Sequence, residues 1–137
     1  MARRWLLKTE PSQYAYADLV RDRRTVWDGV TNAQALIALR QIKKGDHLLV
    51  YHTGSEKAVV ATATAAGDAY ANPRADDPKL AVVDVVPDRQ LPNPVTLARI
   101  KADPDCAGWD LVRLPRLSVM PVTDQQWRAI ERLARQP

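Results

Sequence analysis

Short apolar blocks alternate along this chain with polar segments that contain glycine or proline. Four blocks rich in leucine, valine and alanine predict β-strands over 3–8, 47–52, 57–65 and 80–86. The last block is almost wholly apolar, so we expect that strand to be buried on both faces. The segment 72–78 is expected to be a loop, and two short extended pieces, 111–114 and 116–119, are predicted on either side of Pro115.

Helical patterns occupy the other apolar segments. They predict helices over 15–23, 33–42 and 97–101, and a last helix that begins after Thr123. Asn32 stands where it can cap the second helix, whose last turn is expected at Lys43 and Lys44. Thr123 and Gln126 have the spacing of a capping box, which opens the last helix.

The order of these elements, β-α-α-β-β-β-α-β-α, predicts the fold class. Strands that follow one another in sequence favour an α+β fold with a strongly bent, mostly antiparallel sheet ringed by helices. The chain of 137 residues has no internal repeat or linker, so we expect a single domain over 1–137.

Composition excludes several classes of protein. No apolar stretch approaches the roughly 18 residues of a membrane span, and the N-terminal apolar run is too short for a signal peptide. Cys106 is the only cysteine, which excludes an internal disulfide and a thiolate-rich metal site. We therefore expect a cytoplasmic protein with no membrane partner.

Charge is spread unevenly. Residues 1–44 contain nine Lys and Arg against four Asp and Glu, a balance of +5, whereas 45–90 contain four against seven, a balance of −3. Residues 91–137 contain seven against five, a balance of +2. Basic ends suit a polyanion such as nucleic acid, although a run such as 21–24 is equally typical of a solvated helix end.

The segment 27–35 carries the most chemical information. Trp27 offers an aromatic wall, Asp28 and Gly29 predict a turn, and Asn32 places an amide beside a helix start. Together these groups favour a pocket for a flat polar ring. The alternative is a buried tryptophan, a turn and a helix cap with no ligand.

Three further patches lie at strand ends, where scaffolds often present functional groups. They are 8–12 (Lys8, Thr9, Glu10, Pro11 and Ser12), Tyr51 with His52, and 116–118 (Arg116, Leu117 and Ser118). Each has a structural alternative: a weak surface ion pair, a core tyrosine, and a serine bonded to the main chain.

An enzyme is the rival hypothesis. His52 with Asp28 or Glu10 offers a general base and an orienting carboxylate, and Ser12 or Ser118 could be a nucleophile. The sequence has no nucleophile-elbow, phosphate-loop or paired-histidine motif. We therefore expect no catalytic residue, no metal site and no cofactor.

Six separated motifs together resemble the EVE domain, and the resemblance covers essentially the whole chain. The motifs are 5–11 (WLLKTEP), 27–35 (WDGVTNAQA), 44–46 (KGD), 51–52 (YH), 69–73 (AYANP) and 116–123 (RLSVMPVT). The resemblance implies a PUA-like fold, a small strongly bent β-barrel with helices around it, related to YTH and ASCH domains. Two departures are Ala15, where family members often have Ser, and Met120, where they often have Gln.

The resemblance also implies a function: binding of nucleic acid with a modified base, methylated or hydroxymethylated, in an aromatic-lined pocket. Trp27 would stack on the base, Asn32 would recognise its edge, and Gly29 and Val30 would shape the floor. The residues expected to line or support the pocket are Lys8, Glu10, Pro11, Ser12, Tyr51, His52, Arg116, Leu117 and Ser118.

Several alternatives stay open at this point. A small hydrolase would use His52 and a nearby carboxylate on nucleic acid or nucleotides, and a small-molecule sensor would bind free nucleosides. DNA and RNA are both open as partners, as are proteins of a restriction or regulatory system.

Overall fold

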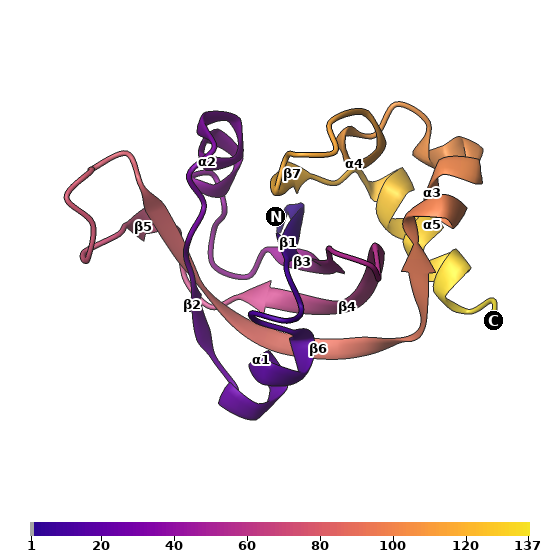
Figure 1. Cartoon of the computed structure of the whole chain (residues 1–137), viewed down its shortest axis with the longest axis horizontal. Helices are drawn as coiled ribbons and strands as arrows, with labels where there is room; N and C mark the ends of the chain where they lie inside the picture. The colour runs from indigo at the N-terminus through magenta and orange to yellow at the C-terminus, as the bar shows by residue number, and fades with distance from the viewer. Residues whose placement is uncertain (1) are drawn as a thin grey trace.

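One curled sheet of seven strands forms the framework of the protein (Figure 1). The computed structural model describes residues 2–137. The strands are β1 (Arg4–Thr9), β2 (Thr25–Trp27), β3 (His47–His52), β4 (Ala58–Ala65), β5 (Tyr70–Ala71), β6 (Ala81–Thr96) and β7 (Val119–Pro121). The helices are α1 (Tyr16–Asp22), α2 (Ala33–Leu39), α3 (Leu97–Ala102), the 3-10 helix η1 (Pro104–Cys106), α4 (Asp110–Arg113) and α5 (Asp124–Ala134).

The sheet has the order β2-β6-β4-β3-β1-β7, with β5 added on β6. All its pairings are antiparallel except that of β1 with β3. The edge strands β2 and β7 do not pair with each other, so the curl is open on one side. There α2 packs against both β7 and β6 and covers the opening (Figure 1). The predicted α+β fold, a bent and mostly antiparallel sheet surrounded by helices, is confirmed.

The long strand β6 produces much of the bend. It runs from β2 and β5 at one end of the molecule to α3 at the other (Figure 1). Its register against β4 shifts twice, between Val59 and Ala61 and between Thr62 and Ala63. Such irregularities bend a strand and tolerate prolines, which lack the N–H of a regular ladder. The sequence predicted only 80–86, because Pro87, Pro92 and Pro94 looked like the end of the strand.

Other differences from the sequence prediction are local. Residues 111–114 are not extended, since α4 makes one helical turn over Asp110–Arg113 before Pro115 ends it. Of 116–119, only Val119 is in a strand. Helix α2 ends at Leu39, so the two lysines at 43 and 44 follow the helix. The strands β2 and β5 were not predicted, because each is too short to show an alternating pattern.

A buried carboxylate joins the start of β1 to the turn before β3. Asp46 is only 2% exposed. Its Oδ1 accepts the N–H of Arg3 at 2.9 Å, and its Oδ2 accepts the indole N–H of Trp5 at 2.8 Å and the N–H of Lys43 at 3.0 Å. Three donors on one carboxylate fix the position of β1, whose opposite end forms the candidate site.

Helix α1 starts without a side-chain cap from Ala15, as its methyl group requires. The carboxylate of Asp18 instead accepts the N–H of Ala15 at 2.8 Å.

Within residues 2–137, none of the helices has both the length and the apolar character needed to cross a membrane.

Candidate functional site

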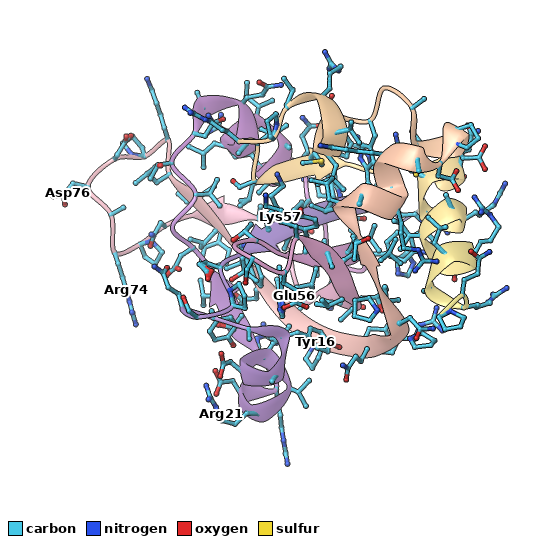
Figure 2. The ribbon with its side chains drawn as sticks, turned by 45° about the vertical axis from the view of Figure 1, so that its right-hand side comes forward. Tyr16, Arg21, Glu56, Lys57, Arg74 and Asp76 are labelled. Carbon is cyan, nitrogen blue, oxygen red and sulfur yellow. The ribbon has the colours of Figure 1, made fainter. Side chains whose placement is uncertain are left out.

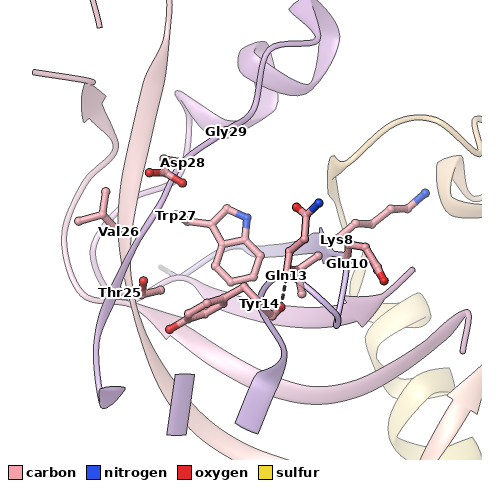
Figure 3. A pocket seen from close by; sticks show the side chains of 10 residues that line it. Lys8, Glu10, Gln13, Tyr14, Thr25, Val26, Trp27, Asp28 and Gly29 are labelled. Atoms are coloured by element: carbon pink, nitrogen blue, oxygen red, sulfur yellow. Dashed lines mark hydrogen bonds between the residues drawn. The ribbon is translucent and has the colours of Figure 1, made fainter. Parts of the chain in front are cut away.

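A cavity of about 330 Å³ lies between the end of β1, the turn that follows it, and β2 (Figure 3). We call it the Trp27 pocket. Its volume falls at the lower end of the range of small-molecule sites, about 300–1,000 Å³. The lining residues are Lys8, Thr9, Glu10, Gln13, Tyr14, Thr25, Val26, Trp27, Asp28 and Gly29.

Two aromatic side chains form one wall of this pocket. Trp27 ends β2, is paired with Val83 of β6, and is 7% exposed. Its ring meets that of Tyr14 edge to face, with the centroids 6.4 Å apart and the planes at 90°. In Figure 3 the indole nitrogen is directed away from Tyr14, and the indole N–H has no acceptor among residues 2–137.

Tyr14 is held in place from the outside of the wall. Its hydroxyl donates to the carboxylate of Asp22 at 3.0 Å. Burial is the largest of the effects that raise the pKa of Tyr14, so this phenol stays neutral at physiological pH. The wall is therefore an uncharged aromatic corner with a free N–H donor.

Polar groups of the 10–13 turn form the opposite side. Glu10 Oε1 accepts the N–H of Ser12 at 3.3 Å and its hydroxyl at 3.0 Å. Glu10 Oε2 is buried and has no hydrogen-bond partner among residues 2–137. The side chain of Gln13 is exposed, and its amide lies above Tyr14 in Figure 3. Buried acceptors are nearly always paired, so an unpaired one calls for a reason.

Lys8 stands at the boundary of the pocket. Its ammonium donates to the carbonyl of Pro115 at 2.9 Å and lies 5.4 Å from the centre of the Tyr51 ring. Burial lowers the pKa of Lys8. Tyr51 is 3% exposed, and its ring packs beside this ammonium. It is not among the residues that line the Trp27 pocket, so its contribution there is to support Lys8.

His52 belongs to a different part of the molecule. It is 7% exposed and lines a cavity with Tyr16 and Glu56, not the Trp27 pocket. Its Nε2 accepts the N–H of Tyr16 at 3.1 Å, which places the proton on Nδ1, and Nδ1 donates to Glu56 at 3.0 Å. The Nε2 bond holds the start of α1 against β3, and the Nδ1 bond joins His52 to the turn between β3 and β4.

The remaining predicted residues surround the pocket without lining it. Asn32, Arg116 and Leu117 line a neighbouring depression with Pro115. Asn32 Oδ1 accepts the N–H of Ala35 at 3.0 Å, which confirms the helix cap. Val30 is buried in the core, and the carbonyl of Ser118 accepts the N–H of Lys8 at 2.9 Å.

The structure thus brings together four of the predicted residues in the Trp27 pocket: Lys8, Glu10, Trp27 and Gly29. Pro11 and Ser12 form the turn that positions Glu10. Sequence reasoning missed Tyr14, Gln13 and Thr25. Gln13 and Tyr14 come directly after the 8–12 patch in the sequence. Extending that patch by two residues would have included both of them.

Comparison with known proteins places this geometry in context. Residues 3–133 match the model of the EVE domain. A curated relative, thymocyte nuclear protein 1 of Danio rerio, is 28% identical in an alignment that covers 93% of this chain and 70% of the relative.

Solved structures agree with that match. Protein Atu2648 of Agrobacterium tumefaciens is 31% identical and superposes with a TM-score of 0.92, over 97% of this chain and 93% of its own. A human THYN1 protein, described in complex with 5-methylcytosine-containing DNA, has the same fold, with 24% identity, a TM-score of 0.90 and 99% of both chains covered.

Proposed function

The chain belongs to the EVE domain family, and on that premise we propose that it is a non-catalytic module that binds DNA carrying a methylated base. The base would leave its stack and enter the Trp27 pocket. The observation that carries this proposal is the combination of an aromatic corner with polar groups that have no partner within the protein.

Stacking would supply the sequence-tolerant part of the affinity. A base stacked on an aromatic side chain gains about 1–3 kcal/mol, which is comparable with the few kcal/mol needed to extrude it from a duplex. The Trp27 ring, fixed at 90° to Tyr14, is a rigid surface for such a contact. Gly29 lines the pocket in a left-handed conformation, with a φ of +78°, and adds no side chain to it.

Hydrogen bonds would supply recognition of the base edge. Carboxylates accept from the exocyclic amino group of cytosine, and carboxamides both donate and accept. Glu10 and Gln13, which line the pocket opposite the Trp27 ring, are therefore the residue types that suit the edge of a nucleobase.

Residues outside the Trp27 pocket would contact the rest of the strand. Asn32 and Arg116 share a depression next to it, and the side-chain amide nitrogen of Asn32 is not used by the helix cap. We assign these two residues to contacts with the nucleic acid beyond the extruded base. Tyr51 would act through Lys8, and His52 through the position of α1.

The pairing of His52 argues against the hydrolase. A general base needs a ring nitrogen that reaches substrate, whereas both nitrogens of His52 are bonded within the protein. Its cavity also lies apart from Glu10 and Asp28, the carboxylates proposed to assist it.

Binding of matched oligonucleotides tests the proposal. Fluorescence anisotropy should show tighter binding of duplex or single-stranded DNA with one 5-methylcytosine than of the same DNA with cytosine. Gln13→Ala and Trp27→Phe should reduce this preference, because the first removes an edge contact and the second shrinks the stacking surface. Trp127→Phe is the matched control: that tryptophan, 8% exposed, lies in α5 outside the pocket.

Equal affinity for methylated and unmodified DNA would reject the proposal as stated. RNA and 5-hydroxymethylcytosine probes then show whether another modified polymer is the ligand. A free methylated nucleoside that binds as tightly as the oligonucleotide would favour the small-molecule sensor, since nucleic-acid binding should strengthen with length and weaken with salt.

A further inference from the structure

A second depression, of about 250 Å³, lies beside the Trp27 pocket and contains three lysines. We call it the lysine pocket. Its lining residues are Lys8, Tyr51, Thr53, Gly54, Lys57, Leu97, Lys101, Leu111 and Pro115. No Asp or Glu is among them, although the chain as a whole has 16 acidic residues.

The lysines of this pocket are not neutralised by the protein. Lys57 and Lys101 make no ion pair or side-chain hydrogen bond with residues 2–137, and the ammonium of Lys8 has only a carbonyl partner. Glu56, next to Lys57 in sequence, is bonded to His52 instead. The carboxylate of Glu10 lies behind the lining, against Gly54, where it accepts the hydroxyl of Ser12.

The two pockets share a wall at the end of β1. Lys8 lines both of them. Thr9 lines the Trp27 pocket and Thr53 the lysine pocket, and the N–H of Thr53 donates to the carbonyl of Thr9 at 2.9 Å. The pockets therefore lie on either side of one pair of hydrogen-bonded strand ends.

The main chain holds Lys57 in an unusual conformation. Its φ is +46°, a left-handed value that is uncommon for residues other than glycine. Its carbonyl accepts the N–H of Leu97 at 2.8 Å, which ties it to α3, the helix that carries Lys101. In Figure 2 Lys57 lies over the sheet, whereas Arg21 and Arg74 project from α1 and from the 72–80 loop. Such backbone outliers cluster at ligand sites.

We propose that the lysine pocket binds a backbone phosphate of the DNA, next to the nucleotide whose base occupies the Trp27 pocket. This inference rests on the proposed function and adds to it the place where the strand is held. Three ammonium groups without an acidic neighbour in the lining attract a phosphate strongly, and contact with it releases the counterions of the DNA. Lys8, on the shared wall, would lie between base and phosphate.

A double substitution tests the phosphate site. Lys57→Gln with Lys101→Gln should lower the affinity for methylated and unmethylated DNA by the same factor and leave their ratio unchanged. The plot of log K against log salt should become shallower by about 0.9 for duplex DNA or about 0.7 for a single strand, the value for one phosphate. Lys43→Gln with Lys44→Gln is the control, because these exposed lysines lie in the turn before β3, at the opposite end of that strand.

A neutral backbone probe locates the phosphate. One methylphosphonate, moved along the methylated oligonucleotide, should weaken binding to the natural chain most at a position flanking the methylated base. The same probe should have a clearly smaller effect on the Lys57→Gln, Lys101→Gln protein, in which only Lys8 of the three lysines remains.

The outcomes separate this inference from the proposed function. A salt slope like that of the control variant, or a methylphosphonate penalty that is undiminished in the double variant, would overturn the phosphate site even if methylated DNA is preferred. Loss of the preference in the natural chain, with the slope change intact, would overturn only the base pocket.

Discussion

Trp27 has two roles that a single substitution cannot separate. With 7% of its surface exposed, it belongs to the core as well as to the pocket. Truncation of a buried tryptophan to alanine costs about 3–5 kcal/mol, so Trp27→Ala would lose binding and stability together. Phenylalanine retains most of the packing, which is why it is the informative substitution there.

Asn32 has separable roles, because its cap uses only the side-chain oxygen. Asn32→Ala should lower the free energy of unfolding by about 1 kcal/mol, whereas Asn32→Ser should retain most of it, since serine caps a helix comparably. Both variants lack the amide N–H, so both should bind methylated and unmethylated DNA more weakly by equal factors. Urea denaturation and anisotropy measure the two effects.

Equal stability of the alanine and serine variants would show that the cap contributes nothing. A change in the ratio of affinities for methylated and unmethylated DNA would instead show that Asn32 contacts the edge of the base.

For single residues, the sequence predicted the local role of a side chain better than its place in the fold. The need of Trp27 for burial and the helix cap of Asn32 follow from residue type and neighbours, and the structure has both. The turn predicted at Asp28 and Gly29 is absent: Gly29 has a φ of +78°, but 28–32 is irregular. Gln13 was missed, because it is exposed and nothing local distinguishes an amide that lines a pocket from any other exposed amide. Only the fold places its amide in the same pocket as Trp27.

Among the elements, α5 is attached through an ion pair that should respond to acid. Arg132 donates to Asp103 at 2.7 Å, and this hydrogen bond is the main cause of the lowered pKa of Asp103. Because the folded pKa lies below the ordinary aspartate value of about 3.9, the pair stabilises the fold above that pH and its contribution is lost as the pH falls below it.

Asp103→Asn should therefore reduce the difference in unfolding free energy between pH 6 and pH 3, measured by urea denaturation. Asparagine keeps the side-chain oxygen that accepts the N–H of Asp105. The reduced pH dependence therefore measures the effect of the carboxylate charge. Asp110→Asn, in the exposed pair with Arg113, is the matched control and should leave the difference nearly unchanged. A pH dependence unaltered by Asp103→Asn would contradict this role.

Elements with strong local signals were predicted with nearly correct ends. The capping box at Thr123 and the apolar strands β3 and β4 are of this kind. Strand β6 was cut short at Pro87, because its extension depends on partner strands and bulges that no window of sequence contains. Helix α4 is a single turn, too short for helical periodicity to show.

For the whole molecule, Cys106 provides a probe of global opening. It is 1% exposed in the 3-10 helix, and burial, with Asp103 and Asp105 nearby, raises its pKa to about 11. At neutral pH the thiolate fraction is then about a hundredfold lower than for a thiol of pKa 9.0. We expect slow reaction with a disulfide reagent in the native protein and rapid reaction in urea.

Bound DNA should slow this labelling further in proportion to its concentration, because a ligand of the folded state lowers the unfolded population. Methylated DNA should slow it more than unmodified DNA. Rapid labelling of the native protein would mean that η1 opens locally and does not report the whole fold.

The parallel pairing of β1 with β3, and the pairing of its other edge with β7, also set an order of events during synthesis. Residues 4–9 leave the ribosome long before residues 119–121, so the outer edge of β1 has no partner until that later segment has followed. The main-chain bond from Lys8 to Ser118 closes only then. A nascent chain can thus form β3, β4 and β6 early, but the lysine pocket stays incomplete until Leu111 and Pro115, and β1 stays unpaired on one edge until β7, have been translated.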